Sequence, residues 1–451
     1  MHTAGTGRTG DRGVLLLSHV GFSFMEDLIA ALGERGLRAH ILTSLPEPAH
    51  QPGRLRDLAD RAASVRATES HELTVADVDA ALDALRAAGT EILACLTVWE
   101  GYRHLMAHAN ARLGVPDLGA EQVLGLRDKL AVRERLAGTG LSRVRAVPLT
   151  EATLAEHQAR PGRYFVKPVR GIASYGTFPL TADTTWEEIR RITEEAGGDT
   201  VYASAFGAGP SFLIEDYLPG REFSFEVLVA DGEPFVVAVH EKCEVTETSG
   251  AVLENACTSP PVSVGPGATA AGLAWVSALL AELGLNWGCF HIEARHDGDR
   301  WDLIEINPRV GGSLISPSVR ELTGETDLLG LWLDLLLSAT GTAPDQRDRL
   351  RRLSYRADGT TPAPNATFFR VFFAEPGLIT GIGVADGLPL APAVTQILLK
   401  EGELIEARAR EVFLGQLLWA FPAADRDRLL PALTEASATA VTVTYAQHQL
   451  T

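Results

Sequence analysis

Residues 290–313, FHIEARHDGDRWDLIEINPRVGGS, are the stretch that decides the fold. Two runs of alternating apolar and polar residues flank the turn-rich tetrapeptide HDGD, a pattern that predicts an antiparallel hairpin. On the first strand His291, Glu293 and Arg295 share one face, and on the second Glu305 and Asn307 share one. If both faces point the same way, two carboxylates and an amide oxygen converge, a set of hard ligands that suits Mg²⁺. Taken alone, the pattern is equally compatible with an exposed charged hairpin, because charged side chains usually lie on solvated surfaces.

The composition is that of an ordinary globular protein. Of 451 residues, 46% are hydrophobic and 22% are charged, which is enough chain for two to four domains of about 100–200 residues. The net charge of −18 argues against a general nucleic-acid or anionic-membrane surface. The cysteines show no metal-ligand spacing, which indicates a reducing compartment and no structural zinc. No apolar run approaches the ~18 residues of a membrane span. We therefore expect a soluble cytoplasmic protein with neither a nucleic-acid nor a membrane partner.

The first part of the chain predicts a parallel α/β layer. The polar residues 1–12 are expected to form a disordered leader. Residues 14–18 form a buried strand candidate, a helical pattern follows, and residues 37–43 form the next strand. The same order recurs around residues 74–98, which favours a doubly wound sheet. The first strand is not followed by GxGxxG, so we expect a Rossmann-like domain without the dinucleotide fingerprint, and a nicotinamide oxidoreductase is excluded.

Later segments predict a mixture of helices and strands. Residues 121–138 read as one helix with Lys129 near its middle, and residues 322–339 as another helix. Residues 244–263 form a long irregular stretch with two prolines, a candidate mobile loop over a site. Three short strands in the C-terminal part, at residues 367–373, 394–399 and 441–445, indicate a small α+β subdomain.

Five motifs follow one another in the middle of the chain. They are RDK at 127–129, FVKP at 165–168, RGIASYG at 170–176, IEDYLPGREFSFE at 214–226 and the HIEA…IEINPRVGGS hairpin. Only four lysines occur, and three of them, Lys129, Lys167 and Lys242, fall in or beside these motifs. In this order and spacing the motifs resemble the ATP-grasp superfamily across roughly residues 115–320. The N-terminal domain and the AEPGLITGIGV segment resemble its L-amino acid ligase branch, whose enzymes form dipeptides by activating a carboxylate as an acyl phosphate.

The resemblance implies an α/β and α+β architecture built on the ATP-grasp fold, with an N-terminal Rossmann-like domain and a small C-terminal α+β subdomain. The implied boundaries are 13–118 for the Rossmann-like domain, 119–211 for the lid subdomain with its leading helix, 212–345 for the large subdomain with the catalytic hairpin, and 346–451 for the C-terminal subdomain.

The resemblance also implies a Mg-ATP site. Lys129 and Lys167 would lie on either side of the nucleotide, and the turn with Gly171, Ser174 and Gly176 would present backbone N–H groups to the phosphates. The remaining implied nucleotide contacts are the adenine-edge residues Glu215, Tyr217 and Leu218, the ribose ligand Glu222, and Lys242, which is equally compatible with a plain surface lysine. The metal ligands would be Glu293, Glu305 and Asn307, with Mn²⁺ as an alternative to Mg²⁺.

The residues that would recognise the substrate are implied less directly by the resemblance. Arg309 would hold the acyl phosphate, and backbone donors at Gly311, Gly312 and Ser313 would stabilise negative charge nearby. The ligase family uses a Glu followed three residues later by a His to hold its amino acid, and Glu254 and Cys257 fall at those positions. Glu254 would pair with a substrate ammonium, whereas Cys257 departs from the pattern and is better read as a small buried cysteine.

Alternatives remain open for the contribution of the first domain to the cleft and for the activity of the protein. Glu100 and Tyr102 could line the cleft from the first domain. The expected partners are a small-molecule carboxylate and an amine, with a second copy of the chain as a further candidate. Two other readings remain: a purine-pathway or carboxylase-type ATP-grasp enzyme, and a non-catalytic ATP-binding protein. Retention of the acidic hairpin residues together with Arg309 argues against the non-catalytic reading.

Overall fold

The computed structural model describes residues 12–22, 24–172, 174–198, 203–206, 211–247, 252–406 and 412–446. The leader predicted for residues 1–12 lies outside these residues except for Arg12, which begins the first strand. Within the described ranges, no helix has both the length and the apolar character that a membrane span needs.

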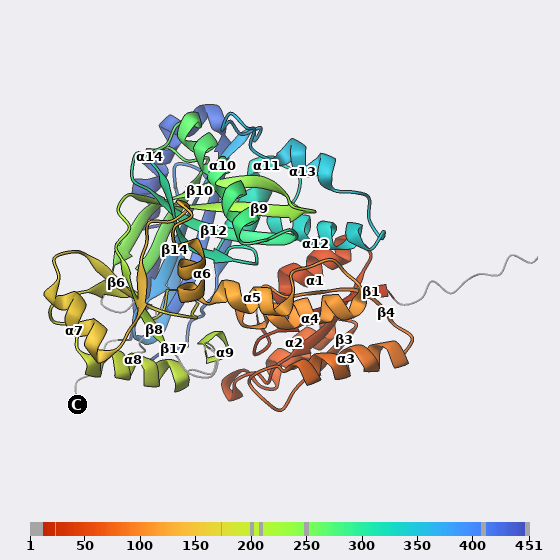
Figure 1. The fold of residues 1–451 in the computed structure, drawn as a ribbon. Coiled ribbons are helices and arrows are strands. Elements are labelled where there is room, and N and C mark those ends of the chain that lie inside the picture. Colours follow the sequence, from red (N-terminus) through yellow and green to blue (C-terminus); the bar gives the residue numbers. More distant parts are fainter. Residues whose placement is uncertain are drawn as a thin grey trace, which may run out of the picture.

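A four-stranded parallel sheet forms the N-terminal part, and its strands lie in the order β3-β2-β1-β4. Strand β1 reads RGVLLLS and is buried at every position after the first, as expected for a parallel strand that is covered on both faces. Helices alternate with these strands (Figure 1), so the doubly wound prediction is confirmed. The elements are β1 (Arg12–Ser18), α1 (Met25–Glu34), β2 (Arg38–Thr43), α2 (Gly53–Arg61), β3 (Ser64–Ala67), α3 (Val75–Ala87), β4 (Glu91–Leu96) and α4 (Arg103–Leu113).

Two short helices, α5 (Ala120–Arg127) and α6 (Lys129–Leu136), lead into the next sheet. The prediction of one continuous helix here was wrong. Asp128 has an extended backbone that interrupts the helix, and its side chain accepts a hydrogen bond from the N–H of Ala131 at 3.0 Å, which caps α6. Lys129 therefore begins a helix instead of lying in the middle of one.

A four-stranded antiparallel sheet, called the lid sheet below, has its strands in the order β5-β8-β6-β7. Its apolar residues form a separate small core together with the helix that follows β7. The elements are β5 (Ala146–Pro148), α7 (Glu151–Ala159), β6 (Tyr164–Pro168), β7 (Phe178–Leu180), α8 (Trp186–Gly198), α9 (Ala203–Phe206) and β8 (Phe212–Asp216).

The largest sheet has eight strands in the order β13-β12-β9-β10-β11-β14-β18-β16, all antiparallel. The predicted hairpin is its edge pair, β12 and β13, so that prediction is confirmed. The strands are β9 (Arg221–Ala230), β10 (Glu233–Glu247), β11 (Val252–Ser259), β12 (Gly288–His296), β13 (Trp301–Asn307), β14 (Asn365–Ala374), β16 (Val394–Ile397) and β18 (Val412–Pro422).

The prediction of an irregular loop at residues 244–263 was wrong over most of its length. Strand β10 continues to Glu247, and β11 returns antiparallel to it from Val252. Residues 248–251 lie outside the described residues. The charged side chains of these strands are partly buried in ion pairs, so their sequence lacks the apolar alternation that identifies a strand.

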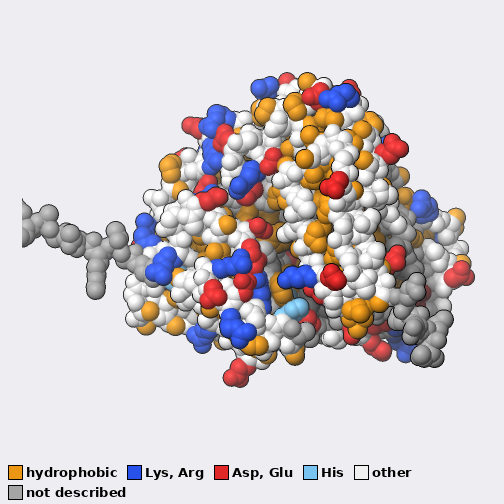
Figure 2. Space-filling view, turned by 180° about the vertical axis from the view of Figure 1, so that it is seen from behind, with side chains coloured by type: hydrophobic (Ala, Val, Ile, Leu, Met, Phe, Trp, Pro, Cys, Tyr) orange, Lys and Arg blue, Asp and Glu red, His pale blue; other side chains and the backbone are white. Residues whose placement is uncertain are grey.

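The C-terminal strands divide between two sheets. Strands β14, β18 and β16 extend the large sheet, while β15 (Gly377–Val384), β17 (Leu404–Ile405) and β19 (Val441–Tyr445) form a small sheet of their own. The three strands predicted here are confirmed. The helices of this half are α10 (Pro266–Glu282), α11 (Ile315–Thr323), α12 (Leu328–Ala339), α13 (Arg347–Leu353) and α14 (Arg426–Ser437). On the rear face in Figure 2, acidic and basic side chains are interspersed.

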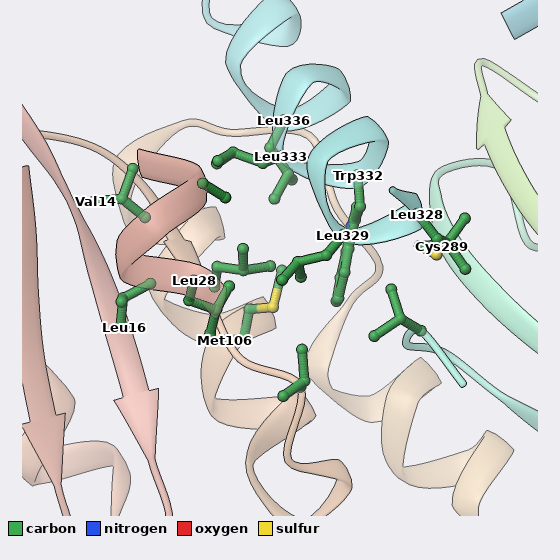
Figure 3. Packing of buried hydrophobic residues seen from close by; sticks show 14 of the residues in the cluster. Val14, Leu16, Leu28, Met106, Cys289, Leu328, Leu329, Trp332, Leu333 and Leu336 are labelled. Atoms are coloured by element: carbon green, nitrogen blue, oxygen red, sulfur yellow. The ribbon is translucent and has the colours of Figure 1, made fainter. Parts of the chain in front are cut away.

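Helix α12 joins the N-terminal part to the large sheet. The predicted helix over residues 322–339 is interrupted, because Gly324 ends α11 with φ of 70° and Asp327 caps α12 through the N–H of Gly330 at 2.7 Å. The fully buried ring of Trp332 lies between Met106 of α4 and the β12 strand (Figure 3). This shared core holds the first domain against the strands that carry the acidic residues.

Candidate active site

A cleft lies between the lid sheet and the β12–β13 edge of the large sheet. The lid and α6 contribute cationic side chains to it, and β12 and β13 contribute carboxylates. The sequence-predicted residues that line it are Glu100, Lys129, Lys167, Gly171, Ser174, Glu215, Tyr217, Leu218, Glu222, Glu293, Glu305 and Arg309. Residues up to 209 positions apart in the sequence, Glu100 and Arg309, thus line one cavity.

The acidic residues of the hairpin converge as the alternating pattern predicts. Glu293 is directly opposite Glu305 in the β12–β13 ladder, and His291 is opposite Asn307. Because side chains of directly opposed residues lie on the same side of a sheet, the two carboxylates share one face. A β-bulge at Ile304 follows this pair and bends the edge strand.

Each of these carboxylates has its own cationic partner. The Nζ of Lys129 lies 3.1 Å from Glu305, and Asn307 donates to the same carboxylate at 2.9 Å. Burial opposes ionisation of Glu305, but Lys129 outweighs it and holds the pKa of Glu305 below its usual value. Glu293 lies 3.2 Å from the Nζ of Lys242 and 3.0 Å from the Nε2 of His291. Despite burial, these two cations also lower the pKa of Glu293.

The two predicted nucleotide lysines lie on different sides of the cleft. Burial disfavours the ammonium of Lys129, but the surrounding carboxylates prevail and raise its pKa. Lys167, at the end of β6, lies 2.5 Å from a carboxylate oxygen of Glu215. The other oxygen of Glu215 contacts Arg133 at 3.0 Å. Burial works against the charge of Glu215, and Arg133 and Lys167 together lower its pKa.

Arg133 is the residue of this region that the sequence reasoning missed. It follows Lys129 by four residues on α6, so both side chains lie on one helix face. This four-residue spacing after Lys129 is the feature of the sequence that could have identified Arg133. Its ion-pair partner Glu215 is 82 residues away in the sequence, so no local pattern could identify the contact.

The glycine-rich turn joins β6 to β7 at the mouth of the cleft. A Cβ at Gly171 would come within 2.7 Å of the ring of Pro168, so only glycine fits there. Ser174 and Gly176 have φ of 53° and 71°, the left-handed region that turns the backbone sharply. Gly176 packs against Phe212 in the lid core and does not line the cavity.

Lys242 occupies a buried cluster of carboxylates, so the reading as a surface lysine is wrong. Its side chain is 1% exposed and contacts Glu222 at 2.7 Å, together with Glu254 and Glu293. Burial disfavours the ammonium, but the three carboxylates raise the pKa of Lys242 well above its usual value. Oxygens of Glu222, Glu254 and Glu293 lie within 4.8 Å of one another, an arrangement able to hold a cation. Glu222 also accepts from Arg295 at 3.0 Å.

Glu254 lies beside the carboxylates of Glu222 and Glu293, but Cys257 does not. Burial raises the pKa of Glu254 to about 7, although Lys242 opposes the shift. Cys257 is 2% exposed and packs in the hydrophobic core with Phe369, and burial raises the pKa of its thiol well above the usual value. Its position agrees with a small buried cysteine and not with a substrate contact.

Arg309 contacts the first domain directly. Its Nη2 lies 2.7 Å from the carboxylate of Glu100, which is 4% exposed. Tyr102 is buried, and its hydroxyl lies 2.8 Å from the Nδ1 of His19 instead of lining the cavity. Gly312 and Ser313 form the bend before α11 and do not line the cavity either.

Comparison with known proteins also indicates an ATP-grasp domain in this chain. Residues 163–317 match the family model of the ATP-grasp domain. Carnosine synthase 1 of Gallus gallus is 26% identical over 339 residues, which is 70% of this chain and 34% of that protein, so the chain spans about a third of this relative. The fold is similar to that of L-amino acid ligase from Bacillus licheniformis, with TM-score 0.73 and 18% identity over 97% of this chain and 100% of that one.

Phosphoribosylglycinamide synthetase from Anaerococcus prevotii is also similar, with TM-score 0.64 and 15% identity over 96% of this chain and 100% of that one. These likenesses confirm the predicted mixed α/β fold, because two solved structures align over nearly the whole chain. The family match covers strands β6, β7 and β8 of the lid sheet, the carboxylate cluster and the hairpin that carries Glu293 and Glu305. Residues 163–317 of this chain therefore match an ATP-grasp domain.

Proposed function

We propose that the protein is an ATP-dependent carboxylate–amine ligase, which activates the carboxylate of an amino acid or a similar molecule and joins it to an amine. The observation that carries this proposal is the position of Arg309. This cation follows the Glu305–Asn307 segment by two residues and lines the same cavity as both lysines. We infer that this further cation, beside the two lysines that would meet the nucleotide phosphates, serves an anionic intermediate such as an acyl phosphate.

The nucleotide would lie between the lid and the large sheet. ATP carries several negative charges, and Lys129 and Lys167 offer cations from two sides of the cleft. Tyr217 would border the adenine. Its ring is held in place by the guanidinium of Arg163, 3.8 Å from the ring centroid. Glu222 would accept from the ribose hydroxyls while Arg295 fixes its orientation at 3.0 Å.

The donor set fits a divalent cation that prefers oxygen. Glu293 and Glu305 present carboxylates on one face, and Asn307, whose amide nitrogen donates to Glu305 at 2.9 Å, would offer its amide oxygen as a neutral ligand. These three residues would hold Mg²⁺ or Mn²⁺, which when bound draws charge from the phosphate oxygens. Lys129 and Lys242 keep both carboxylates ionised and oriented before a cation arrives.

The proposed reaction has two steps. A carboxylate oxygen of the first substrate attacks the γ-phosphorus of ATP, the bond to the β-phosphate oxygen breaks, and ADP leaves. The amine of the second substrate then attacks the acyl carbon, inorganic phosphate leaves, and the amine loses a proton. Arg309 would hold the anionic oxygens in both steps, and its ion pair with Glu100 fixes the guanidinium in place.

Two further observations support amino acids as the substrates. Glu254 lies beside the same carboxylate cluster and would attract a substrate ammonium. Carnosine synthase 1 and L-amino acid ligase are the names of the relatives described above. Both names point to the joining of amino acids.

A product-release screen tests the proposal. ADP and phosphate release would be measured with Mg-ATP and each amino acid alone, and then with amino acids in pairs. We expect release above the background hydrolysis rate for a particular acid with a particular amine, with one coupled product per ADP. If no pair stimulates release although the protein binds nucleotide, the ligase assignment is wrong and a non-catalytic ATP-binding role is favoured.

A further inference from the structure

We propose that Arg133 is a positioning residue that couples the nucleotide lysine Lys167 to the metal-binding strand β13, so that nucleotide and divalent cation bind cooperatively. This inference rests on the proposed function, because it assumes that Lys167 contacts nucleotide and that Glu305 contacts a metal ion. Arg133 itself touches neither ligand; it acts through the groups that it holds.

The guanidinium of Arg133 contacts two separate parts of the site at once. Its Nη1 donates to the carbonyl of Leu303 at 2.7 Å and its Nη2 to the carbonyl of Ile304 at 2.9 Å. Its Nε donates to Glu215 at 3.1 Å. The side chain is 4% exposed. A planar fork with several fixed donors can join these acceptors in one geometry, which the single ammonium of a lysine cannot do.

The carbonyls that Arg133 binds lie at the bulge just before Glu305. The ladder passes from Glu293 opposite Glu305 to Ala294 opposite Leu303, which leaves Ile304 without a partner. Strand β13 is also the edge of its sheet, so no further strand holds it from outside. Arg133 satisfies the backbone there, and its removal would free the segment that orients the Glu305 carboxylate.

The other half of the link runs to the lid. Glu215 on β8 uses one carboxylate oxygen for Arg133 and the other for Lys167. In addition, the backbone N–H of Lys129, at the start of α6, donates to the carbonyl of Val169 at 3.0 Å, two residues after Lys167. A displacement of Lys167 is therefore transmitted to α6, to Arg133 and to β13.

The charges indicate that this group is completed by an anion. Within the group, two cations, Arg133 and Lys167, share the single carboxylate of Glu215, and all three side chains are largely buried. Glu305 also lies within electrostatic range of Lys167, but it is already paired with Lys129, so Lys167 remains available to an anion. A phosphate group at Lys167 would compensate its charge, and the metal ion on β13 would in turn contact the same nucleotide.

The test compares nucleotide affinity with and without metal. The dissociation constant of ADP would be measured by calorimetry in EDTA and at saturating Mg²⁺. The value in EDTA divided by the value in Mg²⁺ reports the coupling between nucleotide and metal. We expect Arg133→Gln to lower this ratio at least about fivefold, the lower end of usual coupling effects. Arg133→Lys, which keeps the charge beside Glu215 but loses the fork, should lower it less.

Arg135→Gln is the matched control, because Arg135 lies on the same helix and donates to the carbonyl of Glu282 away from the cleft. Its ratio should equal that of the wild type. A wild-type ratio in Arg133→Gln would overturn the inference, and so would a wild-type ratio in Arg133→Lys if the glutamine variant does not fold. Failure of the proposed function is distinct: it would appear as a wild-type protein whose ADP release no pair of substrates stimulates, whatever the ratio of ADP dissociation constants.

Discussion

Glu293 and Glu305 are directly opposed across the β12–β13 ladder, yet different cations neutralise them. Lys129 approaches Glu305 from α6, whereas Glu293 is held from β10 by Lys242 and from its own strand by His291. Adjacent carboxylates in a buried site repel each other, so an arrangement of this kind persists only with separate compensation. The two carboxylates are therefore ionised and aligned in the absence of a metal ion, and their contributions can be tested separately.

Glu305→Gln tests the metal assignment. The variant keeps the shape of the side chain but removes the charge opposite Glu293, so we expect turnover to fall at least about 100-fold and Mg²⁺ affinity to weaken. ADP release and a Mg²⁺ titration measure these effects. Asp299→Asn, in the exposed turn of the same hairpin, is the control and should behave as the wild type. Wild-type turnover in the Glu305 variant would remove Glu305 from the metal site.

Arg309→Ala separates acyl-phosphate chemistry from nucleotide binding. Loss of the cation beside Glu100 should lower kcat on the order of 100-fold, the scale of a lost stabilising donor. The dissociation constant for ADP should change by less than about threefold, because the lysines carry that contact. Arg320→Ala on the exposed face of α11 serves as the control. Equal losses in both quantities would mean that Arg309 is only a phosphate contact.

The sequence predicts the parts of this site that repeat at short range. The hairpin with Glu293 and Glu305 is readable because its side chains alternate with a period of two around a turn. Lys167 can be predicted as a site residue because a charged side chain near the end of an apolar strand is unusual. The fold class follows from the same local patterns, together with the order of five motifs.

What the sequence does not predict depends on partners that are distant in the chain. Arg133 reaches the backbone of Leu303 across 170 residues, and no helical pattern indicates that contact. The burial of Lys242 depends on three carboxylates that come from three different strands. The same ion pairs conceal β11 and the end of β10 beyond residue 243, because buried charged side chains give a strand the composition of a loop.

Glu254→Gln tests the proposed contact with a substrate ammonium. Loss of the charge should raise the KM of the amino-acid substrate about tenfold, which corresponds to ~1.4 kcal/mol. Burial places the pKa of Glu254 at about 7, so the wild-type carboxylate gains a proton as the pH falls below 7. The wild-type KM should therefore rise between pH 7 and pH 6, whereas the KM of the variant should stay level.

Glu244→Gln is the control for that measurement, since Glu244 lies on the paired strand β10 and contacts Arg370 at 2.6 Å instead of the cluster. Its pH profile should match that of the wild type. An unchanged KM in Glu254→Gln, or a pH profile identical to that of the wild type, would show that the substrate ammonium binds elsewhere.

Because of His291, we expect the folded state to lose stability toward alkaline pH. Burial opposes its imidazolium, but Glu226 and Glu293 prevail and raise its pKa to about 10 from an ordinary value of 6.5. A raised pKa in the folded state contributes stability that is fully present below pH 6.5 and is lost as the pH rises toward 10. In metal-free buffer, the free energy of unfolding should therefore fall across this range more steeply for the wild type than for His291→Gln. His157→Gln, in the lid, should follow the wild-type curve, and parallel curves for all three proteins would mean that His291 is neutral in the fold.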